Sequence, residues 1–217
     1  VGFKERGNWY GGGEAELFLR MENSAQLKAV QDYLLKLGIP YYDSFIMEKI
    51  AEETGFVKEF VAQIAEYAPS KSIFSYAFVG RNTAGESVED YVQKVQRKII
   101  IDLANQGPCV IVGRCAGYIL SDRHDCLNVF IRGNTEEKKQ RLVEFHDVKP
   151  ENAEKLMRDT DKKRSINYKY YTGRSWGAYT NYTLMLNSTD IGVEKCVERV
   201  SDCIFGVQEP DLERIDQ

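Results

Sequence analysis

Two short, unbroken apolar runs constrain the fold of this chain more than any other feature: CVIVG at residues 109–113 and CLNVFIRG at residues 126–133. Such runs are typical of parallel strands whose two faces are both covered by helices. The segment before the first run, residues 88–105, has apolar residues at helical spacing. Strands that alternate with helices predict an α/β fold with a mostly parallel sheet, right-handed crossovers and a ligand site at the carboxyl ends of the strands.

The remaining segments continue this alternation. Further strands are predicted at residues 14–20, 39–43 and 182–187, and further helices at residues 23–38, at 44–67 with a break near Gly55, at 134–174, and from Val193 to the end of the folded part. We therefore expect one α/β domain over residues 14–206. An irregular lead-in over residues 1–13 precedes it, and a frayed acidic tail over residues 207–217 follows it.

Composition and charge narrow the class of protein. Hydrophobic residues make up 43% and charged residues 29% of the 217 residues, as in ordinary globular domains. The net charge of -4 argues against a general affinity for nucleic acid. The five cysteines include no C-x-x-C pair, and their odd number fits reduced intracellular thiols. No apolar run approaches the roughly 20 residues of a membrane span, so we expect a cytoplasmic protein with neither a nucleic-acid nor a membrane partner.

Two cationic features point to a phosphorylated small substrate. Arg114 directly follows the first apolar run, where a parallel strand delivers side chains to the ligand crevice, although an ordinary ion pair would also explain this position. The second feature is the charged helical segment that ends in MRDTDKKRSINYKYYTGR. Charge runs are usually solvated helix faces. Here, however, Arg158, Lys162 and residues 168–173 are also suited to forming a cationic arm that ends in a loop and closes over phosphates.

Four motifs together resemble one family. GIPYYD, GPCVIVGRCAGYIL, DKKRSINYKYYTG and YTLMLNSTDIGVE, in this order, are similar to the cytidylate-kinase-like branch of the P-loop nucleoside monophosphate kinases, and the likeness covers roughly residues 15–204. The resemblance implies a P-loop NTPase-type three-layer sandwich, in which helices flank a mostly parallel sheet. It also implies a helical lid at about residues 134–175, and transfer of the γ-phosphoryl group of ATP, with Mg²⁺, to a nucleoside monophosphate.

The resemblance also implies roles for individual residues. Gly113 and Arg114 match the Gly-Arg pair that holds the acceptor's phosphate, with Cys115 in place of the aspartate that follows it in those enzymes. Asn187 likewise replaces an acid on the late strand, and Asp161 lies at the acidic position of the lid. The expected acceptor-binding residues are Asp43, Gln96, Gly113, Arg114 and Arg174, and the expected catalytic residues are Arg114 and, from the lid, Arg158, Lys162 and Arg164.

The phosphate-binding loop departs from the family pattern. Relatives carry a Gly-Ser-Gly-Gly-Arg-like loop whose bare backbone amides surround a phosphate. Alignment without gaps places five nucleotide-binding candidates near this position: Asn23, Ser24, Ala25, Gln26 and Lys28. Only Ser24, the expected magnesium-side hydroxyl, matches. The glycines are missing, and a Cβ in their place hinders close approach of the backbone to a phosphate.

A second register is also possible. In that register YGGGE, residues 10–14, is the remnant of the loop, VGFK is the first strand, and ELFLRM becomes helical. In this register the glycines of the loop are present. The phosphate-binding Lys or Arg of the family pattern is missing in both registers. Because the chain starts at Val1 and not at methionine, a third interpretation is that the true loop is absent from this chain.

Two functions follow from these patterns. The first is a phosphotransferase that uses ATP and Mg²⁺ to phosphorylate a nucleoside monophosphate or a related small acceptor. The second is a catalytically inactive kinase-fold protein that binds a nucleotide or a partner protein. The first function is the leading hypothesis, and the altered loop and the two replaced acids, at Cys115 and Asn187, are the support for the second. A homo-oligomer is possible with either.

Overall fold

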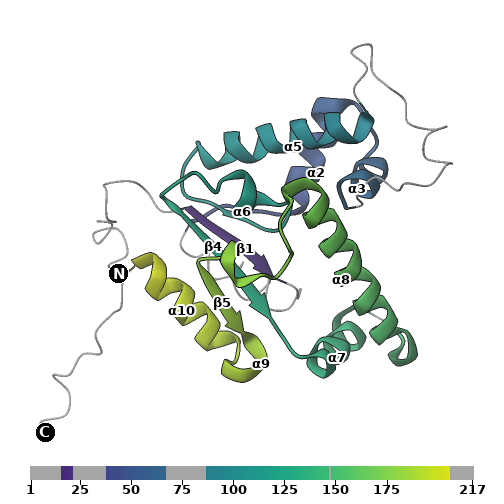
Figure 1. Cartoon of the computed structure of the whole chain (residues 1–217), viewed down its shortest axis with the longest axis vertical. Coiled ribbons are helices and arrows are strands. Elements are labelled where there is room, and N and C mark those ends of the chain that lie inside the picture. Colours follow the sequence, from purple (N-terminus) through teal and green to yellow (C-terminus); the bar gives the residue numbers. More distant parts are fainter. Residues whose placement is uncertain (1–15, 22–37, 67–86, 147, 206–217) are drawn as a thin grey trace, which may run out of the picture.

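The computed structural model describes residues 16–21, 38–66, 87–146 and 148–205. Its strands are β1 (Glu16–Met21), β2 (Tyr41–Tyr42), β3 (Val110–Ile111), β4 (Cys126–Arg132) and β5 (Leu184–Asn187). Its helices are α2 (Ser44–Thr54), α3 (Lys58–Glu66), α5 (Val88–Ala104), α6 (Ala116–Ile119), α7 (Thr135–His146), α8 (Pro150–Thr172), α9 (Ser188–Ile191) and α10 (Val193–Phe205), with a 3-10 turn at Tyr179–Asn181. Figure 1 shows their arrangement.

The strands form one sheet in the order β2-β3-β1-β4-β5, and every pair of neighbours is parallel. β1 is therefore the central strand, although it is the first in the chain. Because all strands run the same way, their carboxyl ends share one edge of the sheet. Along that edge follow Asp43 after β2, Gly113 and Arg114 after β3, and Ser188 after β5.

The first apolar run supplies side chains to both faces of the sheet. Cys109 and Ile111 are buried in one core cluster with residues of α2, α3 and α5. Val110 and Val112 are buried in a second cluster with residues of β4, β5 and α10. Side chains of a strand alternate between its faces, so an unbroken apolar run is what a sheet between two helical layers requires. The predicted α/β sandwich with a parallel sheet is confirmed.

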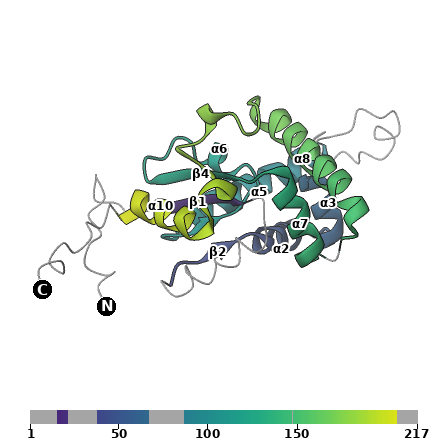
Figure 2. The same cartoon turned by 90° about the horizontal axis from the view of Figure 1, so that it is seen from below.

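The pair α7 and α8 occupies the expected lid position. The two helices pack against each other, and they lie beyond the tips of β1 and β4, at the end of the molecule to which these strands point (Figure 1). The turned view in Figure 2 places them at the same end. The lid region therefore flanks the carboxyl edge of the sheet.

The structure corrects two expectations. Residues 168–173 do not form a loop, because Tyr168 to Thr172 continue α8 and Tyr168 is buried; α8 ends only at Gly173, which has a φ of 70°. The register in which ELFLRM is helical is also wrong, because Glu16–Met21 is a strand of the sheet. Apolar strand residues at the centre of a parallel sheet outweigh their compatibility with a helix.

Several expectations lie outside the described residues: the lead-in over residues 1–13, the helix over residues 23–38 and the tail over residues 207–217. The boundaries of the domain stay predictions. In the part of the chain that the structure describes, the search for a helix long and apolar enough to cross a membrane found none.

Candidate functional site

A strained turn directly after β3 carries Arg114. Gly113, Arg114 and Cys115 all have positive φ, at 72°, 51° and 56°. A short hydrogen bond of 2.9 Å, from the Ala116 amide to the Gly113 carbonyl, closes the turn. Residues other than glycine rarely adopt this conformation. Each such residue costs about 1–3 kcal/mol, and such strain is concentrated at functional sites.

Helix α5 lies behind this turn and contacts it through a glutamine. The Gln96 side chain is buried, with 2% of the residue exposed. Its Nε2 donates to the Gln93 Oε1 at 3.0 Å and to the Arg114 carbonyl at 3.3 Å. Gln96 is thus placed against the backbone of the Gly-Arg pair, inside the core.

Arg174 approaches the same region from the lid. It follows α8, whose end is fixed by Gly173 and by a hydrogen bond of 3.0 Å from the Arg174 amide to the Thr172 Oγ1. The guanidinium carbon of Arg174 lies 5.0 Å from the centre of the Tyr118 ring, a cation–π contact. Tyr118 belongs to α6, the short helix that follows the Gly-Arg turn. The two predicted acceptor cations therefore meet at one unit of the fold: Arg114 lies in the Gly-Arg turn, and Arg174 contacts the helix α6 that follows this turn.

Asp43 closes the site from the side of β2. The Tyr42–Ile111 register places it beside the end of β3, directly after the strand. Burial raises the pKa of Tyr41, and the negative charge of Asp43 raises it further. Tyr41 consequently stays protonated in the physiological range.

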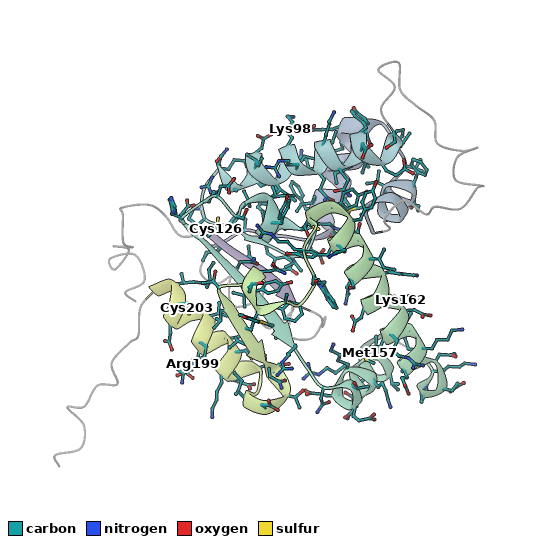
Figure 3. The ribbon with its side chains drawn as sticks, in the orientation of Figure 1. Lys98, Cys126, Met157, Lys162, Arg199 and Cys203 are labelled. Carbon is teal, nitrogen blue, oxygen red and sulfur yellow. The ribbon has the colours of Figure 1, made fainter. Side chains whose placement is uncertain are left out.

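The cations of α8 pair with carboxylates of the lid or are exposed to solvent. Arg164 Nη1 lies 3.2 Å from the Asp161 Oδ1, and Asp161 also binds the Nζ of Lys138 at 3.5 Å. Arg158 pairs with Glu154 at 3.8 Å, with 70% of its side chain exposed. Lys162 is exposed in the middle of α8, at the outer side of the molecule (Figure 3). The structure therefore brings together Asp43, Gln96, Gly113 and Arg114, and it leaves Arg158 and Lys162 on the solvent side.

The residues predicted to hold the nucleotide, Asn23, Ser24, Ala25, Gln26 and Lys28, lie outside the described residues. Their place in the chain is nevertheless constrained. They follow β1, whose Met21 pairs with Ile131 at the carboxyl end of β4. β1, the last described element before them, lies between β3 and β4 in the sheet, and ligand sites of this topology lie at the carboxyl ends of the strands.

The end of β5 has a polar connection to the lid that the sequence did not reveal. Asn187, predicted to replace a family acid, accepts a 3.2 Å hydrogen bond from the Thr189 amide and so caps α9. The Thr189 hydroxyl bonds to Glu137 of α7 and accepts from the Asn134 amide at 2.9 Å. Glu137 in turn pairs with Arg141. Thr189 thereby fastens the first turn of the lid to the edge of the sheet.

Replacing Thr189 with valine keeps the size of the side chain and removes both hydrogen bonds. We expect the free energy of unfolding to fall by about 2 kcal/mol, because two hydrogen bonds are lost and each contributes about 1 kcal/mol. Urea unfolding of this variant measures the loss. Thr180→Val, at an exposed threonine in the 3-10 turn, is the matched control, and an equal loss in the two variants would contradict the role given to Thr189.

Sequence reasoning also missed Gln93, Tyr118 and Tyr171. The Tyr171 hydroxyl lies next to Gln93 without forming a hydrogen bond of normal geometry, and burial raises its pKa, so the hydroxyl stays protonated. The signal for Gln93 and Gln96 was present, since two amides three residues apart lie within the apolar pattern of α5. The contacts of Tyr118 and Tyr171 depend on the meeting of distant elements, and no local pattern encodes that.

The strand order, the helices on both faces and the strained Gly-Arg turn at the carboxyl edge define a P-loop kinase fold. The chain belongs to the cytidylate kinase-like family, whose model matches residues 35–190. Two solved structures are similar. One, an uncharacterized protein from Eubacterium ventriosum ATCC 27560, has a TM-score of 0.62 at 24% identity, with 88% of this chain and 97% of that chain covered.

The other is the shikimate kinase from Bacteroides thetaiotaomicron, with a TM-score of 0.50 at 15% identity and coverage of 88% of this chain and 99% of that chain. At these identities the likeness shows the fold alone. No curated protein matches the chain significantly. The family supports a kinase-like function, and the resemblance of the four motifs is confirmed.

Proposed function

We propose that the protein transfers the γ-phosphoryl group of ATP, with Mg²⁺, to a nucleoside monophosphate or a related small phosphorylated acceptor. The observation that carries this proposal is the strained turn of Gly113 and Arg114 at the carboxyl edge of the parallel sheet, in a chain of the cytidylate kinase-like family. Two non-glycine residues with positive φ, Arg114 and Cys115, cost free energy, and such strain is concentrated at functional sites. The position of Arg114 suits the phosphate of an acceptor.

The acceptor side of the site uses charges from three elements. Arg114 supplies a planar guanidinium with donors that match two phosphate oxygens. Arg174 adds a second positive charge and is oriented by the Tyr118 ring. Asp43 stands at the end of the neighbouring strand and is suited to accept a hydrogen bond from a sugar or base of the acceptor. Together they bind the phosphate and orient the rest of the molecule.

The lid supplies the charge that phosphoryl transfer needs. Catalysis of this reaction consists mainly of positioning and of neutralising negative charge on the transferring group. Arg158, Lys162 and Arg164 are the cations of α8 proposed for this task. Since Arg158 and Lys162 are exposed, they act when α8 moves toward the bound nucleotide, in the manner of other kinase lids.

ATP and Mg²⁺ are assigned to the segment after β1. Its start at the carboxyl end of the central strand, beside the Gly-Arg turn, fits a phosphate site. Ser24 would contribute its hydroxyl to Mg²⁺, and Lys28 is the cation nearest to the expected position in the sequence. When bound, Mg²⁺ neutralises charge on the phosphates and keeps several of its waters.

A thermal unfolding experiment tests the proposal directly. At ten times its Kd, a ligand that binds only the folded state adds about 1.4 kcal/mol, which raises the Tm of a domain of this size by about 3–6 °C. We expect such a shift with ATP and Mg²⁺ together, a second shift with a nucleoside monophosphate, and ADP formation when both are present. A shift with the monophosphate alone, with no effect of ATP and no ADP, would indicate the inactive binding protein instead.

A further inference from the structure

The inward face of α5 contains one polar residue that its surroundings do not fully satisfy. Val92, Gln96, Ile99 and Leu103 repeat on one side of the helix, and all four are buried. An amide in such a stripe is unfavourable unless all of its polar atoms are hydrogen-bonded. The Gln96 Oε1 is buried and has no partner. The core therefore retains a group that an apolar side chain of similar length would replace without this penalty.

The other half of the same amide is fully used. Nε2 carries two hydrogens, and it has two acceptors, the Gln93 Oε1 at 3.0 Å and the Arg114 carbonyl at 3.3 Å. The Arg114 carbonyl, which can only accept, fixes which atom of the Gln96 amide faces the turn, since only Nε2 donates. The amide is thus oriented with its donor toward the Gly-Arg turn, and its oxygen is buried without a partner.

The contact falls on the residue whose backbone is strained. The direction of the Arg114 carbonyl depends on the backbone dihedrals of Arg114, whose φ of 51° is in the left-handed region. In the ordinary right-handed conformation the carbonyl would point elsewhere, and the hydrogen bond from Gln96 would be lost. The bond therefore favours the left-handed turn over the relaxed one, and the turn decides where the Arg114 side chain projects from the sheet edge.

We propose that Gln96 is a positioning residue, which acts through the backbone of Arg114 to hold the arginine in place for the acceptor's phosphate. For the identity of the bound group, this inference rests on the proposed function. The buried oxygen without a partner lowers the stability of the fold, and the fixed turn is the feature that accompanies this cost. Gln96 itself touches neither the phosphate nor the nucleotide, because it is buried behind the turn.

Gln96→Met tests this role, because methionine has a similar length and no hydrogen-bonding groups. We expect the Tm of the variant to change little, because the removal of the unsatisfied oxygen offsets the loss of the two hydrogen bonds that Nε2 donates. We expect the KM for the nucleoside monophosphate to rise about tenfold, in line with the loss of one hydrogen bond, while the KM for ATP stays unchanged. Gln106→Met, at an exposed glutamine beyond α5, is the control and changes neither value. A lower Tm with an unchanged acceptor KM would overturn the proposal.

Amide hydrogen exchange gives a readout that does not need turnover. The Ala116 amide, bonded to the Gly113 carbonyl at 2.9 Å, reports on the closed turn. We expect its exchange to become about tenfold faster in Gln96→Met and to stay unchanged in Gln106→Met. Faster exchange in a protein without kinase activity would leave the positioning role standing and refute the proposed function. Unchanged exchange in an active enzyme would refute the positioning role alone.

Discussion

If the protein has the proposed kinase activity, we expect Arg114→Ala to lower kcat/KM for the acceptor by about 100-fold, equivalent to about 2.7 kcal/mol of transition-state stabilisation. The change removes the guanidinium proposed to bind the acceptor's phosphate. Alanine keeps a Cβ, so the strain of the turn and the hydrogen bond from Gln96 to the carbonyl of residue 114 stay as they are. We therefore expect the Tm to change little. Steady-state kinetics with varied acceptor, together with the melting curve, measure both effects.

Arg199→Ala is the matched control for this prediction. Arg199 lies on α10, on the other side of the sheet from α5, and pairs with Asp202 at 3.1 Å in an exposed position (Figure 3). Exposed pairs of this kind contribute little to stability, and the residue is remote from the sheet edge. Its removal should leave kcat/KM unchanged. Equal kinetics in the two variants would remove Arg114 from the site.

The fold followed from the sequence because its main determinants are local. The alternation of Cys109, Val110, Ile111 and Val112 between the two cores is a property of consecutive residues. The helical spacing before it is equally local, and so is the break at Gly55, which ends α2 with a φ of 74°. Patterns with a period of 2 or 3.6 residues and a glycine at a helix end can be recognised without knowledge of the partner elements.

The site was predictable only in part, because its geometry depends on contacts between distant residues. Sequence reasoning named Arg114 as a ligand residue, but not the positive φ of Arg114 and Cys115, which non-glycine residues adopt only when the surrounding structure requires it. It assigned Gln96 to the acceptor, and the structure buries this side chain behind the turn. The lid cations were expected to act together, yet Arg158 is paired within its own helix.

Tertiary contact also explains the error at the end of α8. The tyrosines at 168–171 and the following glycine suggested a loop on a cationic arm. Tyr168 is instead buried, and the Gly173 amide donates a 2.9 Å hydrogen bond to the Lys169 carbonyl, so the helix continues to Gly173. Burial of an aromatic side chain is a stronger determinant than the local preference of a Tyr-Thr-Gly sequence.

Gly117→Ala tests whether α6 has to pack closely on the sheet to present Tyr118 to Arg174. A Cβ at residue 117 would lie 2.5 Å from the Cγ and Nδ2 of Asn128. Asn128 cannot easily move away, because its Nδ2 donates to the Asn181 carbonyl at 2.6 Å. We expect a loss of about 2 kcal/mol from this overpacking, which lowers the Tm by about 4–8 °C.

The clash should also displace α6 from the sheet. This displacement should change the geometry of the site, because α6 follows the Gly-Arg turn and carries the Tyr118 ring that contacts Arg174. Gly133→Ala is the control: its Cβ would meet nothing closer than the Thr189 Oγ1 at 3.4 Å, and neither glycine has a positive φ. In an unstrained glycine, alanine is tolerated or mildly stabilising. If the two variants have the same Tm, the Asn128 side chain moves aside without loss of stability. The contact between α6 and β4 then does not hold Tyr118 in place. A lower Tm together with weaker binding of the nucleoside monophosphate would show that the packing of α6 and the geometry of the phosphate site depend on one another.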